Sequence, residues 1–227
     1  AVVTPATPIA GGAVPSMDPA TGIVSVPAGT PAGSYSIVYK LCEKLNPTNC
    51  QNATITVPVG VAPIVATNDT ITGINGATGN SNAGSAFTGD SINGQPATIS
   101  NATLAVNTPA APVAGAPVGA PVPVMSPATG VVVVPPGTPA GVYSISYKLC
   151  EKLNPTNCQD AIISVTVDPS PIVVGNDSYT NIIAGTTPNP VGNVLPNDSI
   201  NGQPVTLGGS GNTTLVVKTP ATGTIVP

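Results

Sequence analysis

Apolar and polar residues alternate along residues 34–41, where Tyr35, Ile37, Tyr39 and Leu41 occupy every second position. A period of two predicts a half-buried β-strand. A turn at residues 45–49 follows, and a second alternating run then predicts an antiparallel return strand. The same pattern recurs further along the chain. The predicted core positions are Ala53, Ile55 and Val57 in the first return strand, and Tyr143, Ile145, Tyr147, Leu149, Ala161, Ile163, Val165 and Val167 in the second hairpin.

The two hairpins belong to one long repeat. YKLCEKLNPTNCQ occurs at residues 39–51 and again at 147–159, a displacement of 108. The displacement holds without a gap from Met17/Met125 to Gln95/Gln203. Solenoid repeats of about 20 to 50 residues cannot bury a core alone, whereas about 100 residues is a typical domain. We therefore expect a string of similar domains.

Further short strands are predicted between the turns rich in Gly, Pro and Asn. Val131–Val134 is a β-branched run, and residues 70–74, 97–106 and 122–124 are weaker candidates. No stretch shows helical periodicity, and prolines interrupt most candidates. About seven strands per period predict an all-β fold of tandem immunoglobulin-like β-sandwich domains.

The long hairpin is most naturally the last pair of strands in each domain. This predicts the C-terminal part of one repeat at residues 1–60, a complete repeat at 63–168 and the N-terminal part of the next at 171–227. Two interpretations remain open. In the first, the chain is a part of a longer array of repeats. In the second, the domain boundaries fall at the repeat position of the chain ends, and the chain consists of two whole domains.

The composition narrows the possible partners. Only 6% of the residues are charged, there is no His, and the net charge is −4. A protein that follows nucleic-acid phosphates needs a basic patch, so nucleic acid is excluded as a partner. No apolar run approaches the 18 or so residues of a membrane span, and residues 1–12 do not resemble a signal peptide. We expect a mature internal segment with its targeting signal elsewhere.

Four cysteines form two local pairs, Cys42/Cys50 and Cys150/Cys158. An even, repeated count favours disulfides made in an oxidising compartment outside the cytosol. Zinc is the alternative, but the spacing lacks paired C-x-x-C knuckles. Each disulfide would close the neck of a hairpin.

The segment TPAGVYSISYKLCEKLNPTNCQDAIISVTV at 138–167, NDSY at 176–179 and VLPNDSINGQPV at 194–205 resemble the tandem immunoglobulin-like repeats of giant bacterial cell-surface adhesins. The likeness is to the Bacteroidota type, which includes gliding-motility adhesins. It implies secretion, display on the cell surface, and a stalk or filament that carries an adhesive tip elsewhere.

No catalytic constellation is visible, so we do not expect an enzyme. Asp69 and Asp90, repeated as Asp177 and Asp198, are a conceivable carboxylate pair for glycoside chemistry, but no aromatic platform accompanies them. Calcium at a domain junction is a second possibility. Its candidate ligands are Asp160, Asp168 and Asp177, set against ordinary turn-capping roles for aspartate.

Asp-Ser/Thr pairs occur four times, and three of them resemble the Asp-Ser/Thr-apolar O-glycosylation signal of Bacteroidota, while the one before Tyr179 is a looser match. The candidate glycan sites are Thr70, Ser91, Ser178 and Ser199, and the alternative is turn chemistry. The hairpin tip at residues 43–49 concentrates charge. It is either a solvated turn or a contact with a neighbouring domain.

The leading hypothesis is a non-enzymatic structural module of a secreted, repetitive cell-surface adhesin or extracellular filament. It would act as a disulfide-stapled stalk, with neighbouring repeats or like chains as its partners. The alternatives are a module that binds carbohydrate or a protein receptor, and a subunit of a self-assembling extracellular fibre.

Overall fold

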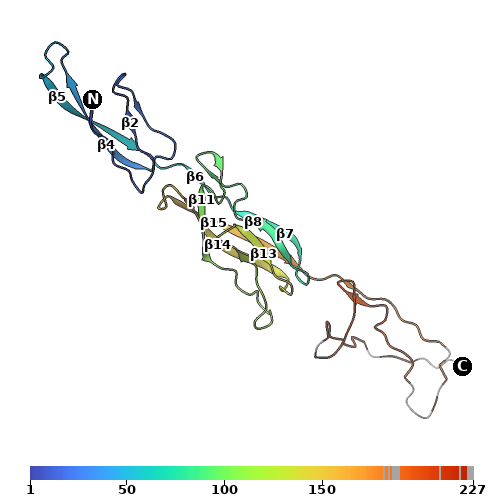
Figure 1. Ribbon diagram of the computed structural model, residues 1–227. Helices are drawn as coiled ribbons and strands as arrows, with labels where there is room; N and C mark the ends of the chain where they lie inside the picture. Colours follow the sequence, from blue (N-terminus) through green and yellow to red (C-terminus); the bar gives the residue numbers. More distant parts are fainter. Residues whose placement is uncertain (181, 184, 186–189, 210, 220, 224–227) are drawn as a thin grey trace.

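The structure is a computed structural model that describes residues 1–227 except 181, 184, 186–189, 210, 220 and 224–227. Its regular elements are β-strands, and the described residues contain no helix, which confirms the all-β prediction. We refer to residues 1–60, 63–168 and 171–227 as the N-terminal, central and C-terminal segments. They follow one another along a long axis (Figure 1), with the N-terminal segment at one end and the central segment in the middle.

The central segment is a sandwich of two sheets in which most neighbouring strands are antiparallel. One has the order β11-β14-β15-β7 and the other β12-β13-β8. Within the first sheet only β7 and β15 run parallel. Numbered along the chain, these seven strands give the immunoglobulin arrangement, in which the third, sixth and seventh strands share a sheet and the second, fourth and fifth share the other. The bounds are β7 Asp69–Asn75, β8 Asn80–Ser85, β11 Ala102–Thr108, β12 Val124–Met125, β13 Val131–Val134, β14 Gly141–Glu151 and β15 Cys158–Asp168.

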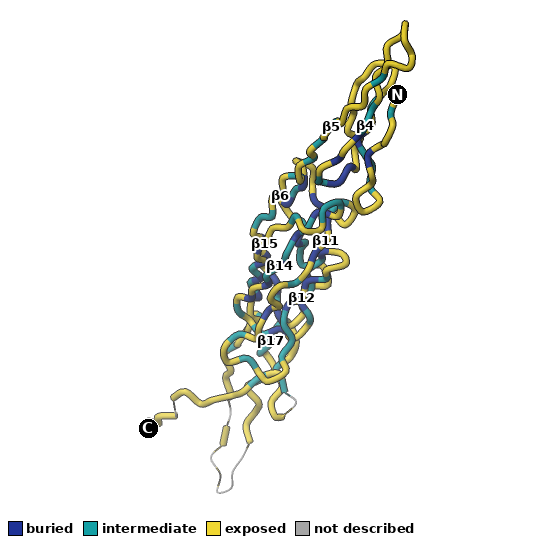
Figure 2. Tube along the Cα trace, turned by 90° about the vertical axis from the view of Figure 1, so that its left-hand side faces the viewer, coloured by how far each residue is buried: buried dark blue, intermediate teal, exposed yellow. Residues whose placement is uncertain are grey.

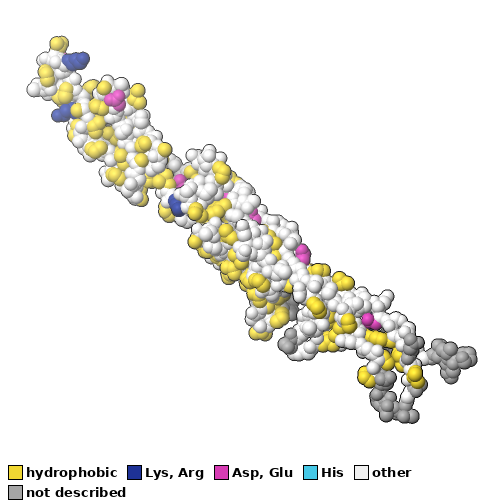
Figure 3. All heavy atoms as spheres, turned by 45° about the vertical axis from the view of Figure 1, so that its right-hand side comes forward, with side chains coloured by type: hydrophobic (Ala, Val, Ile, Leu, Met, Phe, Trp, Pro, Cys, Tyr) yellow, Lys and Arg dark blue, Asp and Glu magenta, His cyan; other side chains and the backbone are white. Residues whose placement is uncertain are grey.

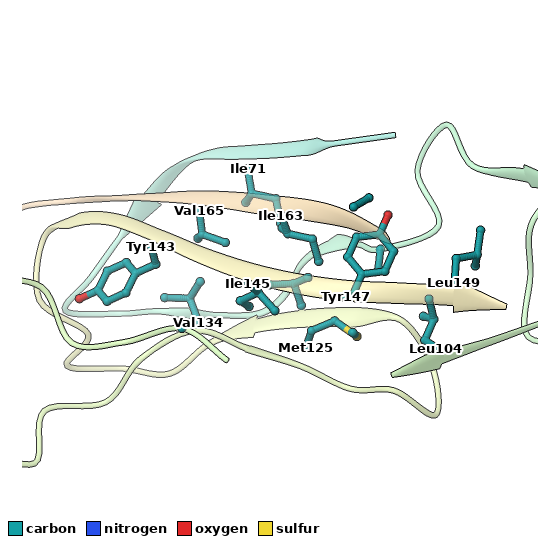
Figure 4. Close-up of a cluster of buried hydrophobic side chains, with 14 of the residues drawn as sticks. Ile71, Leu104, Met125, Val134, Tyr143, Ile145, Tyr147, Leu149, Ile163 and Val165 are labelled. Carbon is teal, nitrogen blue, oxygen red and sulfur yellow. The ribbon is translucent and has the colours of Figure 1, made fainter. Parts of the chain in front are cut away.

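Alternate residues of β14 and β15 fill the space between the two sheets. Tyr147, Leu149 and Ile163 are fully buried there, against Ile71 and Leu104 from neighbouring strands. Figure 4 shows these side chains converging from several strands into one layer. The core positions predicted for the second hairpin are therefore confirmed.

The N-terminal segment has the same hairpin with less around it. Its sheet has the order β1-β4-β5, and β2 and β3 form a separate pair. Its hydrophobic core cluster has three buried residues, Ala6, Tyr35 and Ile37. The bounds are β1 Val2–Thr4, β2 Ser16–Met17, β3 Val24–Ser25, β4 Gly33–Cys42 and β5 Cys50–Val59.

The predicted core position of Leu41 is wrong in this setting. Leu41 is 71% exposed, and Ala53 is exposed as well, because no strand of the described chain covers this end of the hairpin. Figure 2 shows the contrast, with buried residues concentrated in the central part of the rod.

Each junction leads into a small three-stranded sheet. In the central segment β6 (Ile64–Val65) pairs with β9 (Ser91–Ile92), which pairs with β10 (Gln95–Pro96). The C-terminal segment repeats this with β16 (Ile172–Val173), β17 (Ser199–Ile200) and β18 (Gln203–Pro204). The repeat is thus preserved in the structure as well as in the sequence.

Two weaker strand predictions need correction. The strand expected at residues 97–106 begins only at Ala102, because the amides of Asn101 and Ala102 both donate to Thr98 O and close a turn. The strand expected at 122–124 is the two-residue β12 at Val124–Met125, since prolines occupy the positions before it.

Candidate functional site

A closed hairpin is the best-defined unit of the chain, and it occurs twice. The ten pairs of β4 and β5 end at Cys42 opposite Cys50, and those of β14 and β15 end at Cys150 opposite Cys158. Both pairs are joined as disulfides, with 4.1 Å between the Cα atoms. Each bridge lies at the neck of the tip, where it holds the two strands together.

A tyrosine at the start of the first hairpin strand anchors the preceding turn. The Tyr35 hydroxyl donates to Pro31 O at 2.8 Å, and the Tyr143 hydroxyl donates to Pro139 O at 2.7 Å. A tyrosine bonded to backbone a few residues upstream is the tyrosine corner of immunoglobulin-like folds. Sequence reasoning placed these tyrosines in the core but missed the hydroxyl contact. The spacing P-A-G-x-Y in both copies was the available signal.

The tip of the second hairpin forms a joint with the N-terminal segment. Asn154 Oδ1 accepts a hydrogen bond from the amide of Ala32 at 2.7 Å, although 122 residues separate them in the chain. Asn157 Nδ2 donates to Ala62 O at 2.8 Å and to the nearly buried carboxylate of Glu151 at 2.9 Å. The amide of Asn93 donates to Pro63 O at 2.8 Å. The tip is therefore a contact between segments, as one of the two interpretations proposed.

The first hairpin has the same tip without that contact. There, Asn46 Nδ2 donates to Glu43 Oε1 at 2.7 Å and Asn49 Nδ2 donates to Glu43 Oε2 at 3.0 Å. All three side chains are exposed. Asn46 is the counterpart of Asn154, so one asparagine bonds within its own tip while the other reaches across the joint.

The junction after the central segment uses a second asparagine pair. Asn75 Nδ2 donates to Asn201 Oδ1 at 2.8 Å, and the amide of Asn201 donates to Pro171 O at 2.8 Å. Asn93 and Asn201 are equivalent positions of the repeat, and both adopt positive φ. The same turn therefore lies at both joints.

A buried acid pair lies beneath the first sheet of the central segment. The Tyr147 hydroxyl donates to Asp90 Oδ2 at 2.9 Å and approaches Asp69 Oδ2 at 3.4 Å. Asp90 Oδ1 also accepts the amide of Thr67 at 2.7 Å. The structure thus brings together the two carboxylates singled out in the sequence, but as partners of a core tyrosine.

Burial raises the pKa of Asp69 to about 6, and the charge of Asp90 adds to this, while the hydrogen bond from Tyr147 acts in the opposite direction. Burial, together with the bond to Asp90, raises the pKa of Tyr147 far above its ordinary value. Tyr147 is therefore a constant hydrogen-bond donor, and Asp69 is the member of the group that titrates near neutral pH.

The calcium candidates are not gathered into one site. Asp160 accepts a hydrogen bond from Asn107 at 2.9 Å and lies 4.0 Å from Lys148 Nζ, while Asp168 ends β15 and Asp177 is exposed beyond it. Among the described residues, no three acidic, His or Cys side chains are grouped so that they could hold a metal ion. Figure 3 shows the acidic side chains of the visible face standing apart from one another. These residues do not fit a calcium cage.

The four glycan candidates lie near or at strand residues. Thr70 in β7 and Ser178 are exposed, while Ser91 in β9 and Ser199 in β17 are half-buried. A sugar on either of the first two hydroxyls would extend into solvent. Tyr179 is the only exposed aromatic residue in the described part of the chain, so no aromatic platform for carbohydrate is present there.

No protein-family model matches the sequence, and no curated protein is similar to it. Solved structures with partial similarity include ectodomain fragments of three proteins. The human Desmocollin-1 ectodomain is 9% identical, with a TM-score of 0.36 and coverage of 64% of this chain. The Protocadherin gammaB7 EC3-6 cis-dimer is 10% identical, with a TM-score of 0.35 and coverage of 67%. Human CDH23 EC21-23 is 15% identical, with a TM-score of 0.30 and coverage of 82%.

The chain spans 28%, 36% and 66% of the lengths of these three structures, in the same order. In the described residues there is no helix with the length and apolar character that a membrane crossing requires. The immunoglobulin-like class, which the sequence pattern predicted, is assigned here from the strand order of the central segment.

Proposed function

We propose that the chain is a load-bearing structural part of a secreted, repetitive adhesin or extracellular filament, with the C-terminal part of one repeat at residues 1–60, a complete repeat at 63–168 and the N-terminal part of the next at 171–227. The observation that supports this most directly is the joint, where Asn154 and Asn157 of one module bond to backbone at Ala32 and Ala62. Such contacts limit bending between modules. The extended arrangement in Figure 1 suits a stalk.

Two further features support a mechanical role. The chain enters the central segment near Ala62 at the hairpin tip and leaves at Asp168, so tension along the rod pulls β7 and β15 in opposite directions. These strands are parallel and hydrogen-bonded, and their bonds must break together under shear. The disulfide behind them keeps residues 151–157 from extending.

An extracellular location is part of this proposal. Disulfides persist in oxidising compartments, and each hairpin of this chain carries one. The surface has few charges, and O-linked glycans at Thr70 and Ser178 would add polar cover there. Cell-surface display and a bacterial source follow from the family resemblance alone and belong to the proposal on that basis.

Single-molecule force spectroscopy tests the mechanical role. We expect the central segment to unfold in one event with a clear force peak. Cys150→Ser/Cys158→Ser should lengthen the released contour by about 25 Å, because eight residues of up to about 3.6 Å each replace a Cα separation of 4.1 Å. Extension of residues 63–168 without a force peak would rule out a load-bearing module.

A further inference from the structure

The connections before and after the central segment carry different residues at matched positions of the repeat. β5 ends at Val59 and leads into Gly60 and Val61, whereas the same positions after the central segment are Asp168 and Pro169. Proline fixes one backbone dihedral angle, and glycine leaves both free. The connection before the central segment therefore has more conformational freedom than the one after it.

The surroundings of these residues differ in the same direction. Gly60 is exposed, with no atom within 4 Å of the place that a Cβ would take, and Val61 is 57% exposed. Neither residue belongs to a strand. Asp168, in contrast, is the last residue of β15, where it pairs with Asn75 and accepts the amide of Gly76 at 3.0 Å. The sheet thus holds the second connection and leaves the first free.

The residues that follow the first connection are fixed to the central segment. Asn157 Nδ2 donates to Ala62 O at 2.8 Å, and the amide of Asn93 donates to Pro63 O at 2.8 Å. Both donors belong to the central segment, so Ala62 and Pro63 move with it. Rotation between the two segments must therefore take place at residues 60–61.

A small contact holds the N-terminal segment against the central one. The amide of Ala32 donates to Asn154 Oδ1 at 2.7 Å. Leu153 is half-buried beside it, in a cavity of about 300 Å³ that residues 26–30 also line. Its counterpart Leu45, in the tip of the first hairpin, is 88% exposed. We call Asn154 and Leu153 the latch of this joint.

The first tip shows the same residues without a docked neighbour. There Asn46 Nδ2 donates to Glu43 Oε1 at 2.7 Å, whereas the counterparts Asn154 and Glu151 are not bonded to each other in the described structure. Both tips are closed by a disulfide and have the same backbone bond of 3.0 Å. A released Asn154 therefore has a partner within its own tip, and release changes side-chain contacts without unfolding the hairpin.

We propose that the joint before the central segment is a reversible hinge, which turns about Gly60 and Val61 and is held closed by the latch. Opening breaks one hydrogen bond and exposes one leucine, which are small effects, whereas a module unfolds as a cooperative whole. The inference rests on the proposed structural function and specifies how the stalk yields. It bends at this joint before a module unfolds, while the connection at Pro169 stays stiff.

Single-molecule energy transfer on the full chain tests the hinge. Dyes at Thr54 in β5 and Thr72 in β7, both exposed, would report the angle between the segments. We expect a major closed state that exchanges with a minor open one. Leu153→Ala should raise the ratio of open to closed molecules about tenfold, because the latch loses its apolar contact. Leu45→Ala is the matched control and should leave the ratio unchanged. A single state in the wild type that Leu153→Ala does not alter would overturn the hinge.

A second variant tests where the rotation takes place. Gly60→Asp/Val61→Pro copies the connection after the central segment, and both sheets should remain intact because neither residue belongs to a strand. The ratio of open to closed molecules should fall about fivefold, since proline restricts the backbone. The same ratio in this variant and in the wild type would show that the segments do not turn about these residues.

The hinge and the load-bearing function fail in different ways. The force peak of the central segment depends on its own sheets and not on the latch. A force peak without an open state would remove the hinge alone. An open state without a force peak would remove the load-bearing role and leave a flexible joint.

Discussion

Residues 39–51 and 147–159 are identical in sequence and form the same hairpin, yet their surroundings differ. The tips have the same backbone bond, with Glu43 N to Asn49 O and Glu151 N to Asn157 O both at 3.0 Å. Leu41, however, is 71% exposed, and Leu149 is fully buried. The hairpin therefore forms from its own sequence, whereas the burial of Leu149 in the second copy depends on strands from residues 63–108 that pack on it.

The comparison separates two sources of stability. The disulfide, the turn and the tyrosine corner lie within the hairpin and occur in both copies. The apolar core and the Tyr147 network need β7, β8 and β11, and only the second copy has them. Matched substitutions in the two hairpins can measure each source within one molecule.

The largest difference should come from the two leucines. Leu149→Ala removes a fully buried side chain and should lower the free energy of unfolding of the central segment by about 3 kcal/mol. Leu41→Ala removes an exposed one and should have an effect of about 0.5 kcal/mol or less. Chemical denaturation with hydrogen exchange on the peptides of each hairpin would measure both. Equal effects would show that the first hairpin is covered in solution.

The disulfides should come next. Replacing Cys150 and Cys158 by Ser should cost the central segment about 2 to 3 kcal/mol, because the open loop gains entropy in the unfolded chain. The sandwich should still fold, since its core remains. Replacing Cys42 and Cys50 should instead raise exchange along all of β4 and β5, because little else holds those strands. If the amides of β4 and β5 were equally protected from hydrogen exchange before and after that replacement, the disulfide would not be what holds these two strands together.

The sequence predicted the elements that have a clear period. Val131–Val134 and the two hairpins were found because alternation and β-branching are local signals. The strand β8, Asn80–Ser85, was missed because its residues Asn-Ser-Asn-Ala-Gly-Ser contain no large apolar side chain. Its place in the sheet is set by pairing with β13, which is a tertiary contact.

The site was less predictable for the same reason. The cysteine pairing follows from spacing, but Leu41 and Leu149 have identical neighbours in sequence and opposite exposure. The acid pair was noticed as two carboxylates, yet its partner Tyr147 is 57 and 78 residues away. Nothing in the local sequence of the tip distinguishes Asn154, which crosses the joint, from Asn46, which does not.

The acid pair predicts an unusual dependence on pH. The pKa of Asp69 is about 6 in the folded chain, above its unfolded value of about 4. Through Asp69 the folded state therefore binds more protons between these values, and the contribution of this group to stability is complete below about pH 4 and is lost as the pH rises through about 6. At pH 7, where Asp69 is ionised, we expect the free energy of unfolding of the central segment to be about 2 kcal/mol lower than it would be with Asp69 protonated.

Asp69→Asn tests this, because a neutral amide has no such cost. It should raise the melting temperature at pH 7 and flatten the profile between pH 4 and 7. Asp177→Asn is the matched control at an exposed position, and it should leave the profile unchanged. A wild-type profile that rises steadily from pH 4 to 7, with no gain on Asp69→Asn, would show that Asp69 is ionised without penalty.

The smallest effect should be at the joint, where Asn154 bonds to the amide of Ala32 and its counterpart Asn46 bonds within its own tip. Asn154→Ala removes the acceptor of the Ala32 amide, which is held at 2.7 Å, and should cost about 1 kcal/mol of joint stability. The amide of Ala32 should then exchange about fivefold faster, and the rod should bend more in small-angle scattering. Asn46→Ala in monomeric protein should change neither, because that side chain bonds only within its own tip. Equal exchange at Ala32 in both variants would mean that the tip touches the neighbouring module without holding it, and the stiffness of the rod would then come from the proline-rich connections alone.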